Sequence, residues 1–568
     1  MPPAGHPADG ARRVNRELPD IQYALQLTGR NELSLNSAKP VFRPGPRQVV
    51  CRVEAAGLCF SDLKLLKDFD RHTRKSAIVS GIDPGVLAEI PSYVPGRAPT
   101  VPGHEAVVRV WAVGEKVTSC APGDRRLVQT DYRWLRTASS NAAFGYNFEG
   151  ALQEFVLMDE RAITSPEGES MLLPVPEDLS ASALALVEPW ACVEQAYLVR
   201  ERRAFRAGGR MLVAARGELP RGVLAAALEK YGRPGGISWV GESPPDDLPV
   251  AVTRAADVES LPDGGYDDAI VFGAEADTIE AVFPKLAAGG LMVVALGGGR
   301  VGRPVAVPFG RVHYSGIRLV GTPGADPADA MAAIPESGEI RRGDRIGVVG
   351  AAGPMGVMHV VRDLCQGVEG VEVQALDLDE ARLEGLRRMA EPLAESRGLS
   401  FGTANPSQGR PQELFNYVVV MVPSAALVAE AVAKAAEGAI VNVFAGMPVE
   451  STAETDFNAY VDKRVYAIGT SGSRVEDMRA VLDKLSSGAL DTNLSVFAVA
   501  GLEGAAAGLR AVETREAAGK IIVYPSCKGL GLVSLGEMSG RLPEVARHLS
   551  SGLWTAEAEA ELLKAYGS

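Results

Sequence analysis

Cysteine, histidine and basic residues are all scarce in this chain of 568 residues. There are six cysteines, at positions 51, 59, 120, 192, 365 and 527, and no two form a CxxC pair. This spread excludes a disulfide framework and a four-thiolate structural zinc site, and it favours reduced thiols. Lys and Arg total 58 against 71 Asp and Glu, a net charge of -13, so the basic footprint of a nucleic-acid or anionic-membrane binder is absent.

Long apolar segments are also missing. No uncharged apolar run reaches the roughly 18 residues that a membrane span needs. The first twenty residues lack the apolar core of a secretory signal, so we expect a disordered lead and a cytoplasmic protein. What is present is ordinary for a globular protein: 46% hydrophobic and 23% charged residues. At this length we expect two to four domains.

The chain changes character near residue 207. Residues 40–165 contain short apolar or alternating runs bounded by Pro and Gly, which predict a β-rich core, and residues 180–206 have helical apolar spacing. From 207 to about 490, strand-like runs alternate with Ala-rich helical stretches, a pattern typical of βαβ units on a parallel sheet. The expected strands are 211–215, 237–240, 269–272, 291–296 and 317–321, then 346–350, 371–376, 417–422, 439–444 and 465–469. Residues 520–525 predict one more strand, with two helices after it.

The two strand series look like one domain written twice. Tyr266-Asp267-Asp268 corresponds to Phe415-Asn416-Tyr417, and Gly289 and Gly297 correspond to Gly438 and Gly446 with the same offset. A repeat of more than about 120 residues indicates a duplicated domain rather than a solenoid unit. All α/β domains share some of this punctuation, and the agreement over such a length favours duplication.

A glycine turn in the second copy predicts dinucleotide binding. The strand 346–349 leads into Gly350-Ala351-Ala352-Gly353-Pro354-Met355-Gly356 and then a helix. A helix N-terminus behind such a turn favours a pyrophosphate. Asp377 ends the next strand about 20 residues later, where an acid can accept hydrogen bonds from the ribose, so NAD is favoured over NADP, although Arg382 lies nearby. In the first copy, Arg216 and Leu219 replace glycines and Glu218 would face the phosphate, so we expect that copy to have lost this function.

A set of metal-ligand residues is dispersed through the first 200 positions. Cys59 lies in GLCFSD, His104 and Glu105 in PGHE, and Glu188 in EPWAC. Thiolate, imidazole and carboxylate together make a plausible catalytic zinc shell. Taken singly, a buried Cys is usually core, and a Glu before Pro is usually a helix start. The residues alone therefore leave the zinc site open.

Several motifs together resemble one known family. GLCFSD, VPGHE, VGEKVTSCAPGDR, EPWAC and AGPMG with LDLDEARL resemble the zinc-dependent medium-chain dehydrogenase/reductase superfamily, and within it the polyol branch of sorbitol dehydrogenase and L-sorbose 1-phosphate reductase. The resemblance covers residues 40–205 and 340–530. It implies an α/β fold: a β-rich GroES-like catalytic domain at 1–206 completed by 500–568, and an NAD-binding Rossmann-type doubly wound parallel-sheet domain at 336–499. The degenerate Rossmann-type copy expected from the repeat at 207–335 is foreign to the ordinary architecture of this family.

The resemblance also implies roles for single residues. Cys59 and His104 match zinc ligands, and Glu105 and Glu188 match acids that can bind the metal, with Cys192 a weaker substitute for Glu188. Ser61 matches the hydroxyl that relays the alcohol proton. The cofactor motif is carried by Gly353, Pro354, Met355, Gly356, Asp377 and Arg382. Because the four-cysteine lobe of many relatives is missing, we expect a single catalytic zinc ion.

The function implied is hydride transfer between NAD(H) and a secondary alcohol or ketone, expected to be a polyol, sugar or sugar phosphate. Two alternatives stay open: a zinc dehydrogenase of non-sugar alcohols, and a binding or regulatory protein that uses the duplicated domain as its surface. Arg71, Arg74 and Lys75 could hold a phosphate or carboxylate, although a solvated basic loop is the more common arrangement. We expect a monomer or homodimer in which the first copy takes the place of a partner subunit.

Overall fold

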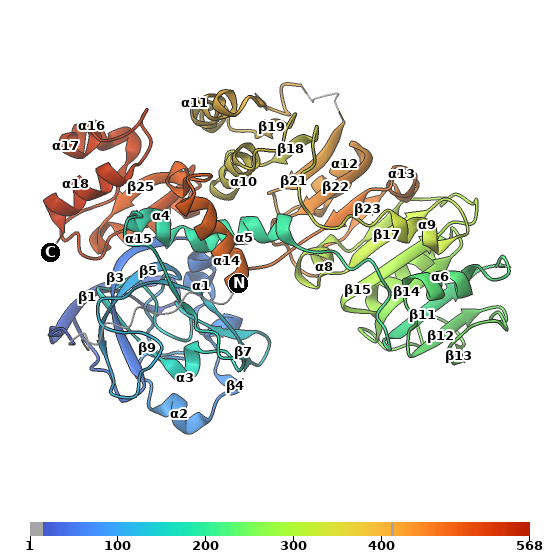
Figure 1. Ribbon diagram of the computed structural model, residues 1–568, viewed down its shortest axis with the longest axis horizontal. Helices are drawn as coiled ribbons and strands as arrows, with labels where there is room; N and C mark the ends of the chain where they lie inside the picture. The colour runs from blue at the N-terminus through green and yellow to red at the C-terminus, as the bar shows by residue number, and fades with distance from the viewer. Residues whose placement is uncertain (1–14, 218, 410–413, 568) are drawn as a thin grey trace. The chain divides into compact units, whose positions relative to one another are not determined.

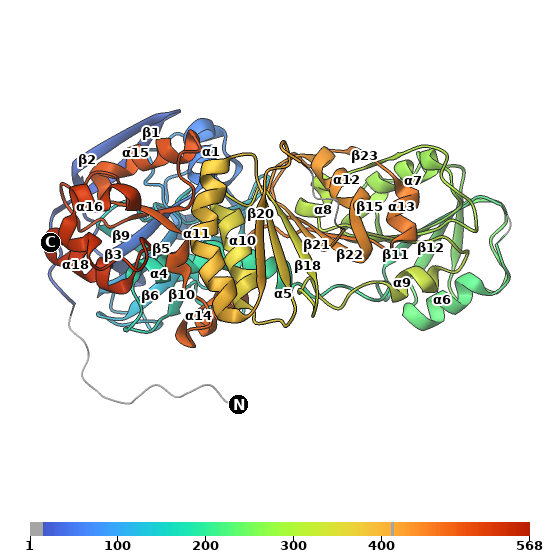
Figure 2. The same ribbon diagram turned by 90° about the horizontal axis from the view of Figure 1, so that it is seen from above.

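The computed structural model describes residues 15–217, 219–409 and 414–567. Its contacts divide the chain into two compact units, Met1–Ala191 with Arg474–Ser568, and Cys192–Ser473 (Figures 1 and 2). The return to the first unit therefore begins at Arg474, whereas the sequence analysis placed it near residue 500. Among the described residues, no helix is both long and apolar enough to cross a membrane.

The first unit is built around a mostly antiparallel sheet. Its strand order is β10-β6-β5-β3-β26-β25-β27, with β9 also paired to β3. The bounds are β3 (Gln48–Leu58), β5 (Glu105–Val113), β6 (Arg125–Val128), β9 (Phe155–Asp159), β10 (Leu172–Pro174), β25 (Val496–Ala500), β26 (Lys520–Val523) and β27 (Val533–Ser534). β26 pairs antiparallel with β3, so the C-terminal segment completes the sheet that the N-terminal segment begins.

Smaller elements surround this sheet. The hairpin β1 (Ile21–Gly29) and β2 (Glu32–Pro40) precedes it, and β4 (Ile78–Ser80), β7 (Asp131–Thr137) and β8 (Asn141–Ala143) form a separate sheet. The helices are α1 (Phe60–Asp68), α2 (Pro84–Ala88), α3 (Glu160–Ile163), α4 (Ala181–Ala185), α14 (Val475–Ser486), α15 (Leu502–Glu513), α16 (Met538–Arg541), α17 (Pro543–Ala546) and α18 (Ala556–Tyr566).

The second unit contains two parallel sheets with the same topology. The first runs β13-β12-β11-β14-β15-β17 and the second β20-β19-β18-β21-β22-β24, which is the doubly wound 3-2-1-4-5-6 order in both. The first-copy strands are β11 (Arg210–Ala215), β12 (Gly236–Gly241), β13 (Val252–Ala255), β14 (Tyr266–Phe272), β15 (Leu286–Ala295) and β17 (Arg318–Thr322). The second-copy strands are β18 (Arg345–Val349), β19 (Glu372–Leu376), β20 (Ser400–Ala404), β21 (Phe415–Val420), β22 (Ala435–Val443) and β24 (Tyr466–Ile468).

Helices connect these strands. They are α6 (Val223–Tyr231), α7 (Ala276–Val282), α8 (Phe309–Tyr314) and α9 (Pro327–Ala332) in the first copy, and α10 (Pro354–Cys365), α11 (Glu380–Arg397), α12 (Ala425–Ala433) and α13 (Phe457–Asp462) in the second. Even a local irregularity is repeated: the register of β14 on β15 shifts between Tyr266 and Asp268, and that of β21 on β22 shifts between Phe415 and Tyr417. The expected fold class, a β-rich domain with two Rossmann-type parallel sheets, is confirmed.

The two copies face each other through their last strands. β17 lies against β24, and β16 (Val305–Val307) pairs antiparallel with β23 (Ala453–Thr455). The Asn458 side-chain amide accepts a hydrogen bond from the Val301 N–H and donates one to the Val301 carbonyl, each at 2.9 Å. The Tyr460 hydroxyl donates to the Leu319 carbonyl at 2.9 Å. One apolar core contains residues of both copies, including Val294 and Val461. One edge of each sheet, at β17 and at β24, is therefore covered by the other copy, while β13 and β20 form the opposite edges.

Three expectations are corrected by the structure. The helix expected over 180–206 is α4 followed by α5 (Val187–Leu198), because the arginines beyond it are held in extended chain: Arg200 forms a β-bridge with Ser337, and Arg202 pairs with Asp268 at 2.6 Å. The expected disordered lead is ordered from Asn15, whose side chain bonds the backbone of Val113, while residues 1–14 lie outside the described part. The sequence also missed β13 and β20, which are short edge strands without an apolar run.

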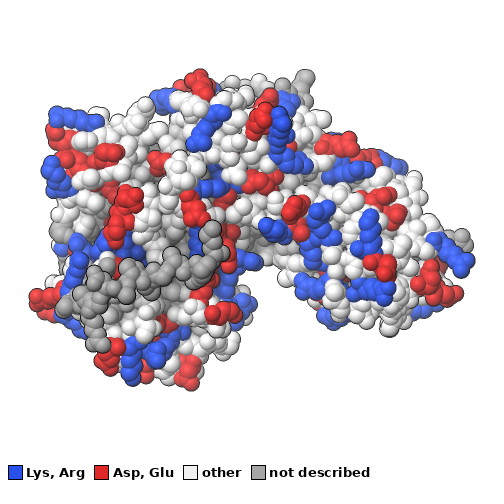
Figure 3. Space-filling view, viewed as in Figure 1, with Lys and Arg blue, Asp and Glu red and all other residues white. Residues whose placement is uncertain are grey.

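On the face shown in Figure 3, acidic and basic side chains are interspersed.

Candidate metal and dinucleotide sites

The register of two neighbouring strands brings the predicted metal ligands together. β3 ends at Leu58, and Cys59 is the N-cap residue of α1 in extended conformation. β5 begins at Glu105, directly after His104, and Gly57 of β3 stands opposite Glu105. Residues that are 45 positions apart in sequence thus share one end of the sheet.

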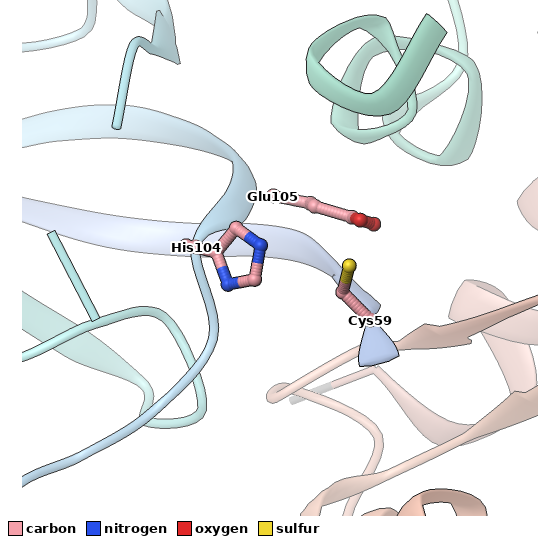
Figure 4. Close-up of side chains that lie close together, drawn as sticks. All are labelled: Cys59, His104 and Glu105. Carbon is pink, nitrogen blue, oxygen red and sulfur yellow. The ribbon is translucent and has the colours of Figure 1, made fainter. Parts of the chain in front are cut away.

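Cys59, His104 and Glu105 converge on one point. Their ligand atoms lie within 4.8 Å of one another, and Figure 4 shows the sulfur, the imidazole and the carboxylate turned toward the same space. His104 is 5% exposed and Glu105 is fully buried, while Cys59 is half-buried. The Oε2 atom of Glu105 is buried with no hydrogen-bond partner among the described residues. An orphaned buried carboxylate oxygen beside a thiol and an imidazole fits a zinc ion.

Asp62 orients the histidine, and sequence reasoning missed it. Its Oδ1 lies 3.0 Å from Nδ1 of His104, and its Oδ2 accepts a hydrogen bond from the Cys59 N–H at 3.0 Å. Burial raises the pKa of Asp62, but the His104 ring and these hydrogen bonds outweigh it, and the net pKa is lowered. A carboxylate on the outer nitrogen fixes the tautomer that presents Nε2 as a metal ligand. The signal in the sequence was the acid three positions after the cysteine, in GLCFSD.

Lys520 holds Glu105, the third candidate ligand, in place. Sequence reasoning missed this lysine too. Its ammonium lies 2.5 Å from Oε1 of Glu105, and the pair is almost completely buried. Gly57 makes room for this carboxylate, because a Cβ there would lie 2.1 Å from Oε2 of Glu105. The lysine opens β26, so the C-terminal segment contributes directly to this site. No spacing rule links residues 105 and 520, and only the fold brings them together.

Glu188 and Ser61 lie outside the cluster of three. Glu188 begins α5 and is 7% exposed. Burial raises its pKa to about 7, His104 opposes this shift, and the nearby charge of Glu105 adds to it, so Glu188 lies within electrostatic reach of both residues. Ser61 is half-buried in the first turn of α1. Their roles as ligand and proton relay stay predictions, and Cys192 is half-buried on α5.

Two rings, those of Tyr146 and His72, lie next to the His104 ring in succession. The rings of His104 and Tyr146 have centroids 5.6 Å apart, and Tyr146 in turn lies 5.1 Å from the ring of His72. Burial raises the pKa of Tyr146 to about 12, so the phenol stays neutral. Neither Tyr146 nor His72 was singled out from the sequence, because both lie in loops without a recognisable motif.

The glycine turn of the second copy has the form that a pyrophosphate needs. Gly350 has φ +81°, so the left-handed position is a glycine, and Ala351 is buried without such strain. At Gly356 a Cβ would lie 2.4 Å from the Gly350 carbonyl, so only glycine lets the turn pack on α10. At Gly353 a Cβ would meet nothing nearer than 3.8 Å, and Gly353, Pro354 and Met355 are half-exposed at the helix N-terminus. This open end of α10 suits a phosphate anion.

Asp377 is positioned by the same turn. Its Oδ2 accepts from the Ala352 N–H at 3.0 Å and its Oδ1 from the Asp379 N–H at 3.1 Å. Arg382 lies on α11, with Nε 3.6 Å from Asp379. Asp377 thus stands at the end of β19 beside the turn, as expected for a ribose partner. In the first copy, Arg216 is exposed, Leu219 is half-buried, and Glu218 lies outside the described residues.

Comparison with known proteins finds similarity over parts of this chain. Residues 45–167 match the alcohol dehydrogenase GroES-like domain. An uncharacterized protein, YggP, of Escherichia coli K12 is 24% identical over 40% of this chain and 58% of its own length. L-sorbose 1-phosphate reductase of Klebsiella pneumoniae is 29% identical over 38% of this chain and 54% of its own length. Residues 45–167 thus match a domain of the alcohol dehydrogenase GroES-like family, and the sequence resemblance to the medium-chain dehydrogenase/reductase superfamily agrees with this match.

A similar fold is found among solved structures. The 2R,3R-butanediol dehydrogenase of Bacillus subtilis matches with a TM-score of 0.50 and 15% identity, covering 89% of this chain and 99% of that one. The chain spans little more than half the length of the two curated relatives, at 58% and 54%. Cys59, Ser61, His104 and Glu105 fall inside the matched GroES-like stretch, whereas Glu188 and the glycine turn follow it.

Proposed function

We propose that this protein is a zinc-dependent oxidoreductase of the medium-chain dehydrogenase/reductase superfamily that transfers a hydride between NAD(H) and a secondary alcohol or ketone of a polyol, sugar or sugar phosphate. The observation that carries the proposal is the convergence of Cys59, His104 and Glu105 within 4.8 Å. A zinc ion held there would supply Lewis-acid polarisation of the substrate oxygen. The polyol class is supported by the relative that is named L-sorbose 1-phosphate reductase.

The chain's own residues prepare this chemistry. Asp62 keeps the His104 ring oriented, and Lys520 keeps the Glu105 carboxylate in place without occupying its Oε2. Ser61, two residues after Cys59, is the candidate to move the substrate hydroxyl proton outward. The open N-terminus of α10 and Asp377 would hold the NAD pyrophosphate and ribose.

We further propose that the protein needs no partner subunit for its nucleotide-binding sheet. The edge strand β24 is covered by β17 of the first copy, and β16 pairs with β23. Exposed strand edges invite association between chains, and covering them removes that tendency.

The test measures activity and metal together. Purified protein is assayed for NADH consumption against a panel of ketoses and keto acids, and the zinc content of the same sample is determined. We expect close to one zinc per chain, lost in Cys59→Ser and retained in Cys120→Ser, whose half-buried thiol lies outside the cluster. A metal-free protein that neither consumes nor binds NADH would overturn the proposal and favour the binding-protein alternative.

A further inference from the structure

The three basic residues that follow α1 have three different environments. Arg71 is exposed. Lys75 is fully buried, and its ammonium donates to the carbonyls of Val94 and Ala98. Arg74 lies between these extremes, with its side chain 28% exposed and 2.8 Å from the buried carboxylate of Asp131. The loop is therefore not uniformly solvated, and Arg74 is the member that is both held in place and accessible.

Arg74 lies close to the metal cluster. Its guanidinium carbon is 5.6 Å from the centroid of the Tyr146 ring, and that ring is 5.6 Å from the His104 ring. His72 contacts the same tyrosine with centroids 5.1 Å apart, and its Nδ1 accepts from the Arg74 N–H at 3.3 Å. A single aromatic ring thus separates Arg74 from the metal ligand His104.

Several charged side chains surround this position. The positive charges of Lys64 and Arg74 lower the pKa of His72, and the negative charge of Asp68 raises it. Asp131, the partner of Arg74, also has Arg133 at 3.8 Å, so one carboxylate stands between two guanidinium groups. Phe60 is 58% exposed beside Lys64, whose ammonium lies 5.9 Å from the ring. The loop around His72 therefore carries the cations Lys64, Arg74 and Arg133 against the acids Asp68 and Asp131, while Asp62, Glu105 and Glu188 are the acids on the side of the cluster.

We propose that Arg74 determines substrate specificity by binding an anionic group, a phosphate or a carboxylate, that the substrate carries a few atoms from its reacting carbon. This proposal rests on the oxidoreductase function proposed above and narrows its substrate class. A guanidinium matches the geometry of either anion, and the ion pair with Asp131 holds it in one orientation before substrate arrives. A neutral polyol would make no use of this charge.

The test compares Arg74→Met with Arg71→Met, which removes the same charge from an exposed position in the same loop. Reduction of fructose 1-phosphate, acetoacetate and fructose is followed through NADH consumption, and fructose 1-phosphate binding is measured by calorimetry. We expect Arg74→Met to lose at least about tenfold in kcat/KM and in affinity for the anionic substrates, as for a lost charged hydrogen bond. The Arg71→Met protein should behave like the wild type, and the loss of fructose turnover in Arg74→Met should be much smaller than its loss with the anionic substrates.

Arg74→Lys guards against misfolding, because it keeps a cation beside Asp131 but loses the forked geometry. We expect this variant to fold like the wild type and to show an intermediate loss of kcat/KM for the anionic substrates. The comparison of fructose 1-phosphate with acetoacetate reveals whether phosphate or carboxylate is favoured. Equal losses for fructose and the anionic substrates would overturn the proposal, as would a wild type without preference for anions. If no substrate is reduced, the proposed function fails, and calorimetry still decides whether Arg74 binds the phosphate.

Discussion

The Oδ1 atom of Asp62 lies 3.0 Å from Nδ1 of His104, while the other oxygen of the same carboxylate accepts the Cys59 N–H. One side chain therefore orients two of the three candidate zinc ligands. The contact is local in sequence for Cys59 and distant for His104, so it links the start of α1 to the start of β5.

Replacing this carboxylate should weaken metal binding without unfolding the protein. In Asp62→Asn the amide oxygen can still accept the Cys59 N–H, but the charge that supports the His104 ring is lost. We expect zinc affinity to fall roughly 10- to 100-fold, as for other partners of ligating histidines. Competition with a chelator measures the affinity, and unchanged affinity would show that Asp62 serves only as a helix cap.

The buried ion pair of Lys520 and Glu105 predicts a large stability effect. Lys520→Met leaves the Glu105 carboxylate buried without its partner, which should cost about 3–5 kcal/mol in the free energy of unfolding of the chelator-treated protein. Lys528→Met is the control: its partner Glu154 is 3.2 Å away, but Lys528 is 45% exposed. Exposed pairs contribute at most about 1 kcal/mol.

The double variant Lys520→Met with Glu105→Gln completes that measurement. Removing the charge of Glu105 as well should restore much of the lost stability, because the cost comes from an unpaired buried charge. Urea denaturation gives each free energy of unfolding. Losses that simply add would mean that the two side chains do not interact energetically.

Two glycines of the nucleotide turn should respond differently to alanine. Gly356→Ala places a Cβ 2.4 Å from the Gly350 carbonyl, so the turn must shift, and both melting temperature and NADH affinity should fall. In Gly353→Ala the new Cβ meets nothing nearer than 3.8 Å, so the fold should be retained while the phosphate is kept from the helix end. NADH fluorescence titration and calorimetric melting separate the two effects. Full NADH affinity in Gly353→Ala would place the pyrophosphate elsewhere.

A buried acid of the second unit predicts a pH dependence of stability. Burial raises the pKa of Asp363 to about 7, and its Oδ2 accepts from the Tyr197 hydroxyl at 3.1 Å. Because the folded state holds this proton more tightly than the unfolded chain, its contribution is lost as pH rises through 7, by about 1 kcal/mol between pH 6 and 8. Asp363→Asn should flatten the stability profile over that range. An unchanged slope would assign the pH dependence to other groups.

Covering of the β24 edge by β17 predicts a monomer. Light scattering should give a mass near 59.8 kDa across a wide concentration range. A stable dimer whose interface contains β24 would contradict the proposal, since that strand lies against β17.

The sequence predicts those strands and site residues that short, local patterns of residues indicate. The apolar strands of both copies were expected close to their observed positions, because a strand buried on both faces is a continuous apolar run. Cys59, His104 and Glu105 could be chosen because their residue types are unusual and their motifs compact. Lys520 could not be chosen, because a lysine at the start of a strand is ordinary until the fold places it beside a buried acid. Arg74 could not be separated from Arg71 and Lys75 by charge, and only the structure distinguishes it, through its ion pair with Asp131 and its contact with Tyr146.

The facing of the two Rossmann-type copies has a consequence for how this molecule can vary. In a symmetric assembly of identical subunits, every substitution at the contact appears on both sides at once. Here the two sides of the contact, such as Val301 and Asn458, are different positions of one chain. One copy can therefore accumulate substitutions while the other keeps the residues of its proposed binding site. If only the second copy binds the dinucleotide, as the sequence predicts, saturation should follow a simple hyperbola, because the molecule then has no second equivalent site.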